Sequence, residues 1–94
     1  MRLFSVKTGD RILRVRKEDF GCAILDRNQY VEGNETVYKV LKILSQGKTL
    51  KETVDILAER ENIPQEEVRE DVLSLMKMFN DLGWFTELTE GIEE

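Results

Sequence analysis

The residue types that carry chemistry are few in this chain and lack partners. Cys22 is the only cysteine and histidine is absent, so neither a zinc site nor an iron–sulfur cluster has enough ligands. There is no glycine-rich phosphate loop and no serine or cysteine in a recognisable nucleophile motif. Carboxylates gather at Glu66, Glu67, Glu70 and Asp71, but exposed helix carboxylates without a cleft do not perform acid–base catalysis. The sequence therefore predicts a protein that is not an enzyme and uses no metal or other cofactor.

Charge and hydropathy limit the classes of partner. Residues 1–17 carry six basic side chains against one acidic side chain, a net charge of +5, and residues 18–94 carry −10. A body this acidic is a poor match for phosphate backbones, so no nucleic-acid partner is expected. No apolar run is long enough for a membrane span, and the first residues are too polar for a signal peptide. Together with the lone cysteine, this indicates a cytoplasmic protein with no membrane partner.

The elements that hold these side chains begin with strand patterns. Leu13 and Val15 alternate with arginines in the stretch Arg11–Arg16, which is the period of a half-buried strand. A short apolar run follows at residues 22–25, and residues 30–32 resume the strand pattern after a polar turn. Three short strands so close together predict an antiparallel meander.

Three helices follow the predicted meander. Asn34 is a good N-cap for the first, which ends at Gly47, and Thr49 with Glu52 forms a capping box for the second. Pro64 fits the first turn of the third helix, whose apolar stripe is Val68, Val72, Leu75, Phe79 and Leu82. The predicted fold is α+β, a winged helix-turn-helix with three strands before three helices. We expect one domain over residues 1–85 and a frayed acidic tail over residues 86–94.

Several ordered segments together resemble the PqqD-like family. They are Val15–Gly21, Asn34–Glu35 opening a helix, Gly47–Val54, and Glu67–Val72 followed by Leu75, Phe79, Leu82, Gly83 and Trp84. The likeness covers roughly residues 11–85. The chain departs from the family pattern at Gly33, where members often carry leucine, and a glycine there weakens the predicted third strand.

The resemblance implies a peptide-recognition role. Such domains bind the leader of a ribosomally made precursor peptide and work beside a maturase, often a radical S-adenosylmethionine enzyme. The leader adds as a strand to the edge of the third strand and lies in a groove against the third helix. The chain supports this in part, because Asn28–Glu32 has no lysine or proline to guard an edge. The candidate peptide-binding residues are Asn28, Gln29, Tyr30, Val31, Glu32, Arg69, Leu73, Met76 and Asn80.

Other interpretations stay open at this point. Leu73 and Met76 form a second stripe on the third helix that fits either a groove or the wide edge of a core face. A winged helix could instead bind DNA as a transcriptional regulator. However, residues 61–71 contain one basic side chain, Arg69, and five acidic side chains, including Asp71. A protein–protein adaptor could use the same strand edge. An unpaired edge also allows two copies of the chain to form a homodimer.

Overall fold

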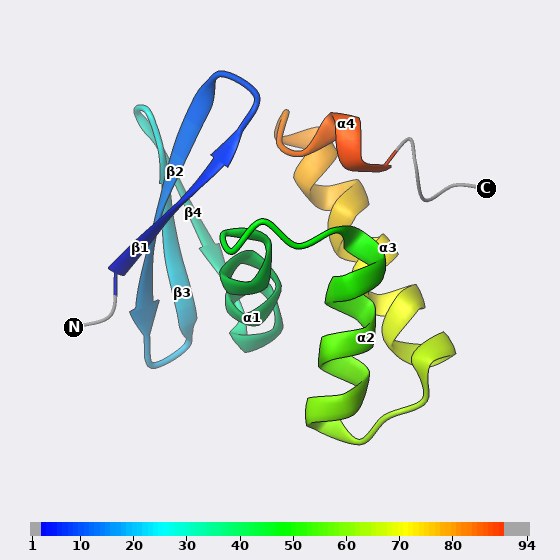
Figure 1. Ribbon diagram of the computed structural model, residues 1–94. Coiled ribbons are helices and arrows are strands. Elements are labelled where there is room, and N and C mark those ends of the chain that lie inside the picture. Colours follow the sequence, from blue (N-terminus) through cyan, green and yellow to red (C-terminus); the bar gives the residue numbers. More distant parts are fainter. Residues whose placement is uncertain (1–2, 90–94) are drawn as a thin grey trace. The chain divides into compact units, whose positions relative to one another are not determined.

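The computed structural model describes residues 3–89 and divides the chain into two compact units. The N-terminal unit is Met1–Gly47 and the C-terminal unit is Lys48–Glu94. Four strands and a helix form the first unit, and the remaining helices form the second (Figure 1). No helix among the described residues is both long and apolar enough to cross a membrane.

The sheet of the N-terminal unit is an antiparallel meander. Its strands are β1 (Leu3–Thr8), β2 (Arg11–Glu18), β3 (Gly21–Asp26) and β4 (Gln29–Gly33), in the spatial order β1-β2-β3-β4. The prediction of three strands was wrong by one, because residues 3–8 also form a strand. Phe4 and Val6 turn toward the core while their neighbours stay exposed, and the two residues Gly9 and Asp10 connect β1 to β2.

Helix α1 (Glu35–Leu44) packs against one face of this sheet. The predicted N-cap is confirmed, because the Asn34 side chain accepts a hydrogen bond of 2.9 Å from the Val37 amide. The Tyr38 ring meets Phe4 of β1 at a centroid distance of 5.7 Å in an edge-on geometry. The buried apolar residues on the strands are Val6, Leu13, Val15, Cys22, Ala23 and Ile24. All of them except Ala23 alternate onto the face that α1 covers, so the core of this unit lies between the sheet and α1.

The C-terminal unit contains α2 (Leu50–Glu61), α3 (Gln65–Asp81) and the short α4 (Thr86–Thr89). The predicted capping box is confirmed: Glu52 accepts from the Thr49 amide at 2.9 Å, and Thr49 accepts from the Glu52 amide at 3.1 Å. Asn62 ends α2 in the left-handed conformation, with φ of 56°. The segment expected to fray therefore begins with one turn of helix, and residues 90–94 of that predicted tail lie outside the described residues.

The buried stripe of α3 differs from the predicted one. Val68, Val72 and Phe79 are buried as expected, but Leu75 is only half-buried and Met76 is fully buried. Leu75 and Met76 each follow Val72 by about one helical turn, and a stripe of spacing i, i+4, i+7 serves as well as one of spacing i, i+3, i+7. The Phe79 ring contacts the rings of Trp84 and Phe85 at centroid distances of 5.7 and 5.8 Å.

Candidate functional site

Strand β4 is an edge of the sheet. One side of it pairs with β3, in a register that runs from Asp26 opposite Gln29 to Cys22 opposite Gly33. No strand among the described residues pairs with its other side. The predicted third strand is therefore confirmed as a strand, and it lies at the position where an additional strand can join.

The register decides which main-chain groups of β4 face outward. A two-residue loop makes Asp26 and Gln29 a hydrogen-bonded pair, and such pairs alternate along an antiparallel ladder. Val31 then shares hydrogen bonds with Ile24 of β3. The amide and carbonyl groups of Tyr30 and Glu32 point away from β3, toward the open edge. These two residues carry the main-chain groups that a partner strand would meet.

The side chains of Tyr30 and Glu32 lie next to each other on the sheet face that α1 does not cover. Both residues are exposed, and the Tyr30 hydroxyl donates a hydrogen bond of 3.1 Å to the Glu32 carboxylate. Desolvation and, after it, this hydrogen bond raise the pKa of the Tyr30 phenol above its ordinary value. Val31 projects to the opposite face and is half-buried. The edge therefore presents a polar pair on one face and an apolar side chain on the other.

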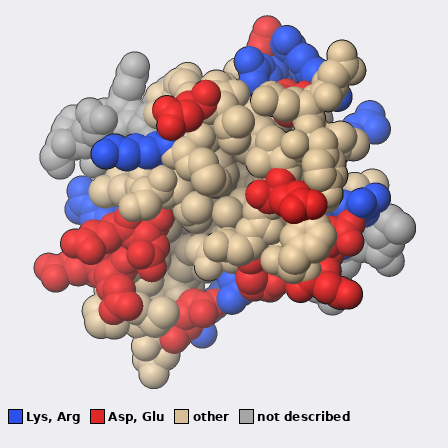
Figure 2. Space-filling model, turned by 180° about the vertical axis from the view of Figure 1, so that it is seen from behind, with Lys and Arg blue, Asp and Glu red and all other residues tan. Residues whose placement is uncertain are grey.

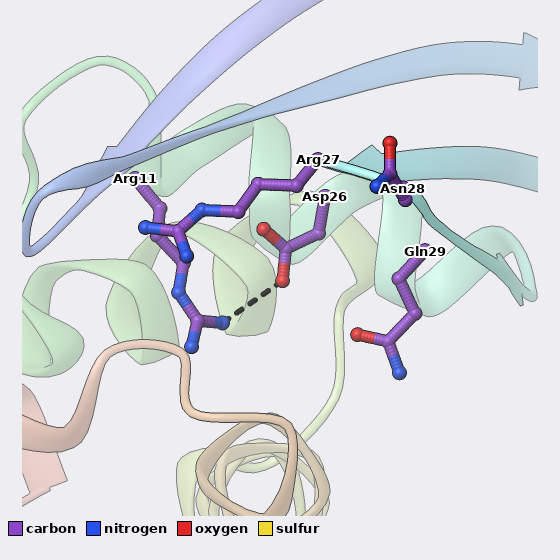
Figure 3. Close-up of a pocket in the computed structure, with 5 residues that line it drawn as sticks. All are labelled: Arg11, Asp26, Arg27, Asn28 and Gln29. Atoms are coloured by element: carbon purple, nitrogen blue, oxygen red, sulfur yellow. Dashed lines mark hydrogen bonds and ion pairs between the residues drawn. The ribbon is translucent and has the colours of Figure 1, made fainter.

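The loop before β4 borders a surface hollow. Arg11, Asp26, Arg27, Asn28 and Gln29 line a space of about 390 Å³ at this end of the sheet (Figure 3). Arg11 of β2 forms an ion pair of 2.9 Å with Asp26 of β3, whose side chain is 2% exposed. Asn28 and Gln29 are exposed beside this pair. The hollow thus brings the first two predicted site residues to the start of the open edge.

Gly33 is the last residue of β4, and its lack of a side chain allows α1 to pack closely against the strand. A Cβ atom added to Gly33 would lie 2.8 Å from Val37 Cβ and 3.2 Å from Cys22 Sγ. Such distances are shorter than ordinary contacts. The glycine that weakens strand propensity is therefore needed for packing, and β4 includes it.

The other predicted site residues lie on α3 in the C-terminal unit. Arg69 is exposed, Leu73 and Asn80 are half-buried, and Met76 has no exposed surface. The Asn80 amide group donates a hydrogen bond of 2.9 Å to the Trp84 carbonyl, so Asn80 helps to hold the end of the helix. Because Met76 is buried, it is a core residue. Its position in the sequence had been compatible with either a groove or the edge of the core face. The groove that would combine these residues with β4 stays a prediction.

A family model described as coenzyme PQQ synthesis protein D (PqqD) matches residues 21–84. The matched span is well over half of the chain. The chain belongs to the PqqD family. No curated protein and no solved structure gives a significant match.

In this PqqD-family protein the matched span begins at β3 and includes β4, α1, α2 and α3. It therefore contains the open edge and every predicted site residue. Strands β1 and β2 precede it. Members of the PqqD family are accessory binding proteins of peptide-modification pathways, which act with a precursor peptide and a modifying enzyme, and this chain has a role of that general kind.

The charge of the two units in this PqqD-family protein is opposite. The N-terminal unit has nine basic and six acidic side chains, a net charge of +3, whereas the C-terminal unit has five basic and thirteen acidic side chains, or −8. Figure 2 shows acidic side chains grouped over the helices of the C-terminal unit. A helix that reads DNA needs basic side chains, so α2 and α3 are poor candidates for that task. Among residues 3–89 no cluster of three or more carboxylate or thiol ligands is placed to hold a metal ion.

Proposed function

We propose that this protein binds the leader segment of a ribosomally made precursor peptide as an added strand on β4. In this role it presents the peptide to a modifying enzyme of the radical S-adenosylmethionine class. The observation that carries the proposal is the open edge of β4, where the main-chain groups of Tyr30 and Glu32 face outward. Membership of the PqqD family supports the choice of a peptide as the ligand.

Strand addition explains the composition of the edge. Main-chain hydrogen bonds align the bound peptide, and pockets for alternate side chains distinguish one peptide from another. Here alternate peptide side chains would lie beside the Tyr30–Glu32 pair on one face and beside Val31 on the other. No lysine or proline guards these residues. The role is one of binding and presentation, so it requires no catalytic group of the protein's own.

The proposal also includes a contribution from α3 and a winged-helix arrangement of the three long helices with the sheet. Of the predicted set on α3, Arg69 is exposed and Leu73 is half-buried, so both have surface that a peptide can contact. A leader peptide with an acidic or apolar side chain suits these two residues. Met76 is left out because it is buried.

Proline substitution at the edge tests the proposal. Glu32→Pro removes an outward-facing amide donor and places a ring where the partner strand would lie. Binding of synthetic leader peptides, taken from short precursor genes beside the gene for this chain, is measured by calorimetry. We expect Glu32→Pro to weaken binding about tenfold or more, which is the effect of losing roughly 1–3 kcal/mol.

Ser5→Pro is the matched control because Ser5 occupies the equivalent outward-facing position on β1, the opposite edge of the sheet. It should leave peptide affinity unchanged. Val31→Pro would remove a donor to β3 and therefore tests folding, not binding. If Glu32→Pro stays folded and binds the leader as tightly as the parent protein, peptide addition at β4 is wrong.

A further inference from the structure

One face of the sheet is unusually apolar for a surface. We call it the outer face, which is the face not covered by α1, and it consists of Leu3, Ser5, Lys7, Ile12, Arg14, Arg16, Glu18, Gly21, Ala23, Leu25, Tyr30 and Glu32. Four of its large apolar side chains are exposed: Leu3 at 63%, Ile12 at 61%, Leu25 at 48% and Tyr30 at 54%. The solvated face of an antiparallel sheet ordinarily carries polar side chains. Arg14 and Arg16 of β2 lie between Leu3 of β1 and Leu25 of β3, and a surface that combines exposed apolar side chains with charged ones is typical of an interaction site.

The centre of the outer face is hollowed. Leu3, Arg14, Arg16, Ala23, Leu25 and Tyr30 line a space of about 200 Å³, with contributions from all four strands. Ala23 is the small residue of this group and is 5% exposed, so it forms the floor. A cavity of about 150 Å³ holds a benzene molecule. The hollow therefore accepts one leucine- or phenylalanine-sized side chain.

Two guanidinium groups border this hollow. Arg14 and Arg16 are alternate residues of β2, so their Cα atoms are about 7 Å apart on the same face. Arg14 lies opposite Ser5 and Leu25, and it forms no ion pair within the part of the chain that the structure describes. Arg16 pairs with Glu18. Arginine forks match carboxylates in a bidentate geometry, so this border selects acidic side chains.

We propose that the outer face is a docking site for a segment of a partner protein that carries carboxylates on both sides of one leucine- or phenylalanine-sized side chain. The apolar side chain enters the hollow above Ala23, and the carboxylates bind Arg14 and Arg16. The positive charge of the N-terminal unit attracts such a segment. The net charge of −5 of the whole chain disfavours extended polyanions such as nucleic acid or an anionic membrane.

The hollow shares Tyr30 with the β4 edge, but its floor at Ala23 lies outside that edge. A strand added to β4 would lie about 5 Å beyond it and about 10 Å from β3, which carries Ala23 and Leu25. Side chains of that added strand reach Tyr30 but not the floor of the hollow. The outer face therefore takes a second ligand, and this inference does not depend on the proposed leader binding.

A short acidic peptide tests the site on the full chain. The probe is acetyl-Glu-Ser-Leu-Ser-Glu-amide, which in an extended form places the leucine and both carboxylates on one side. A ¹⁵N-labelled sample titrated with it should show shifts at the amides of Arg14, Arg16, Ala23 and Leu25. Replacing both glutamates with glutamine, or the leucine with serine, should weaken binding about tenfold. Equal binding of all three peptides, or preferred binding of a DNA oligonucleotide or anionic vesicles at this face, would overturn the proposal.

Variants separate this site from other surfaces. Arg14→Glu with Arg16→Glu should abolish binding of the probe, and Ala23→Leu should abolish it by filling the hollow while keeping both arginines. The matched control is Lys48→Glu with Lys51→Glu, which makes the same change of charge at exposed positions of the C-terminal unit and should bind normally. Probe binding that survives both the arginine change and Ala23→Leu contradicts the site.

Discussion

Gly33 of β4 and Val37 of α1 touch so closely that a Cβ atom on Gly33 would lie 2.6 Å from Val37 Cγ1. Val37 is 2% exposed, and its β-branched side chain has little rotational freedom. The glycine therefore sets the distance at which α1 follows the edge strand. The same contact positions the last residue of the proposed peptide-binding edge.

The first prediction concerns this contact. Gly33→Ala should lower the free energy of unfolding by about 1–3 kcal/mol, because the core must shift to admit the methyl group. Urea denaturation measures the loss. In a Val37→Ala background the same substitution should cost less, since the contact with Val37 Cγ1 is gone while the contact with the Cβ atom remains. Additive effects of the two substitutions would show that they do not interact.

The second prediction concerns α3. Met76→Ala should cost about 2–5 kcal/mol of stability, as expected for a fully buried side chain. Leu73→Ala should cost clearly less because Leu73 is half-buried. Thermal melts of the two variants at one protein concentration provide the comparison. A larger loss for Leu73→Ala would mean that the buried stripe runs through residue 73.

The third prediction concerns pH. Burial raises the pKa of the Cys22 thiol from 9.0 to about 11, so the folded state favours the neutral thiol more than the unfolded state does. The resulting stability is fully present below pH 9 and is lost as the pH rises through about 11. Relative to Cys22→Ala, the parent protein should lose on the order of 2 kcal/mol over this range. Parallel pH profiles of the two proteins would contradict the assignment.

The fourth prediction concerns the start of α2. The hydrogen bond from the Thr49 amide lowers the pKa of Glu52 below its ordinary value. This contribution to stability is therefore present above the ordinary glutamate pKa and is lost as the pH falls through the lowered one. Thr49→Ala should destabilise the protein by about 1 kcal/mol at pH 7. The stability difference between the parent protein and Glu52→Gln should disappear in acid, and a difference that persists at pH 2 would argue against the capping box.

Local patterns in the sequence predicted the helix boundaries well, because capping depends on neighbours three or four residues away. The Asn34 cap and the Thr49–Glu52 box were both found this way. Strand β1 was missed although a signal existed: Phe4 and Val6 alternate, and Gly9-Asp10 is a two-residue hairpin turn.

The features that escaped prediction depend on contacts between residues distant in sequence. Leu75 and Met76 each complete an apolar stripe on α3, and only tertiary packing decides which one is buried. The outer-face hollow needs the register of three strand pairs, which brings Leu25 of β3 beside Arg14 of β2. No periodicity within a single strand contains that information.

The short length of β4 has a consequence for how a bound peptide is discriminated. Its five residues leave two, Tyr30 and Glu32, with outward main-chain groups, which offer at most four hydrogen bonds. At about 1 kcal/mol each, these bonds amount to a dissociation constant of about 1 mM. Any tighter interaction has to come from side chains. Main-chain hydrogen bonds do not distinguish one peptide from another, because every sequence without proline offers the same backbone groups. Selectivity among cellular peptides is therefore a property of side-chain contacts, and exchanging those side chains should redirect the protein to a different peptide without rebuilding the edge.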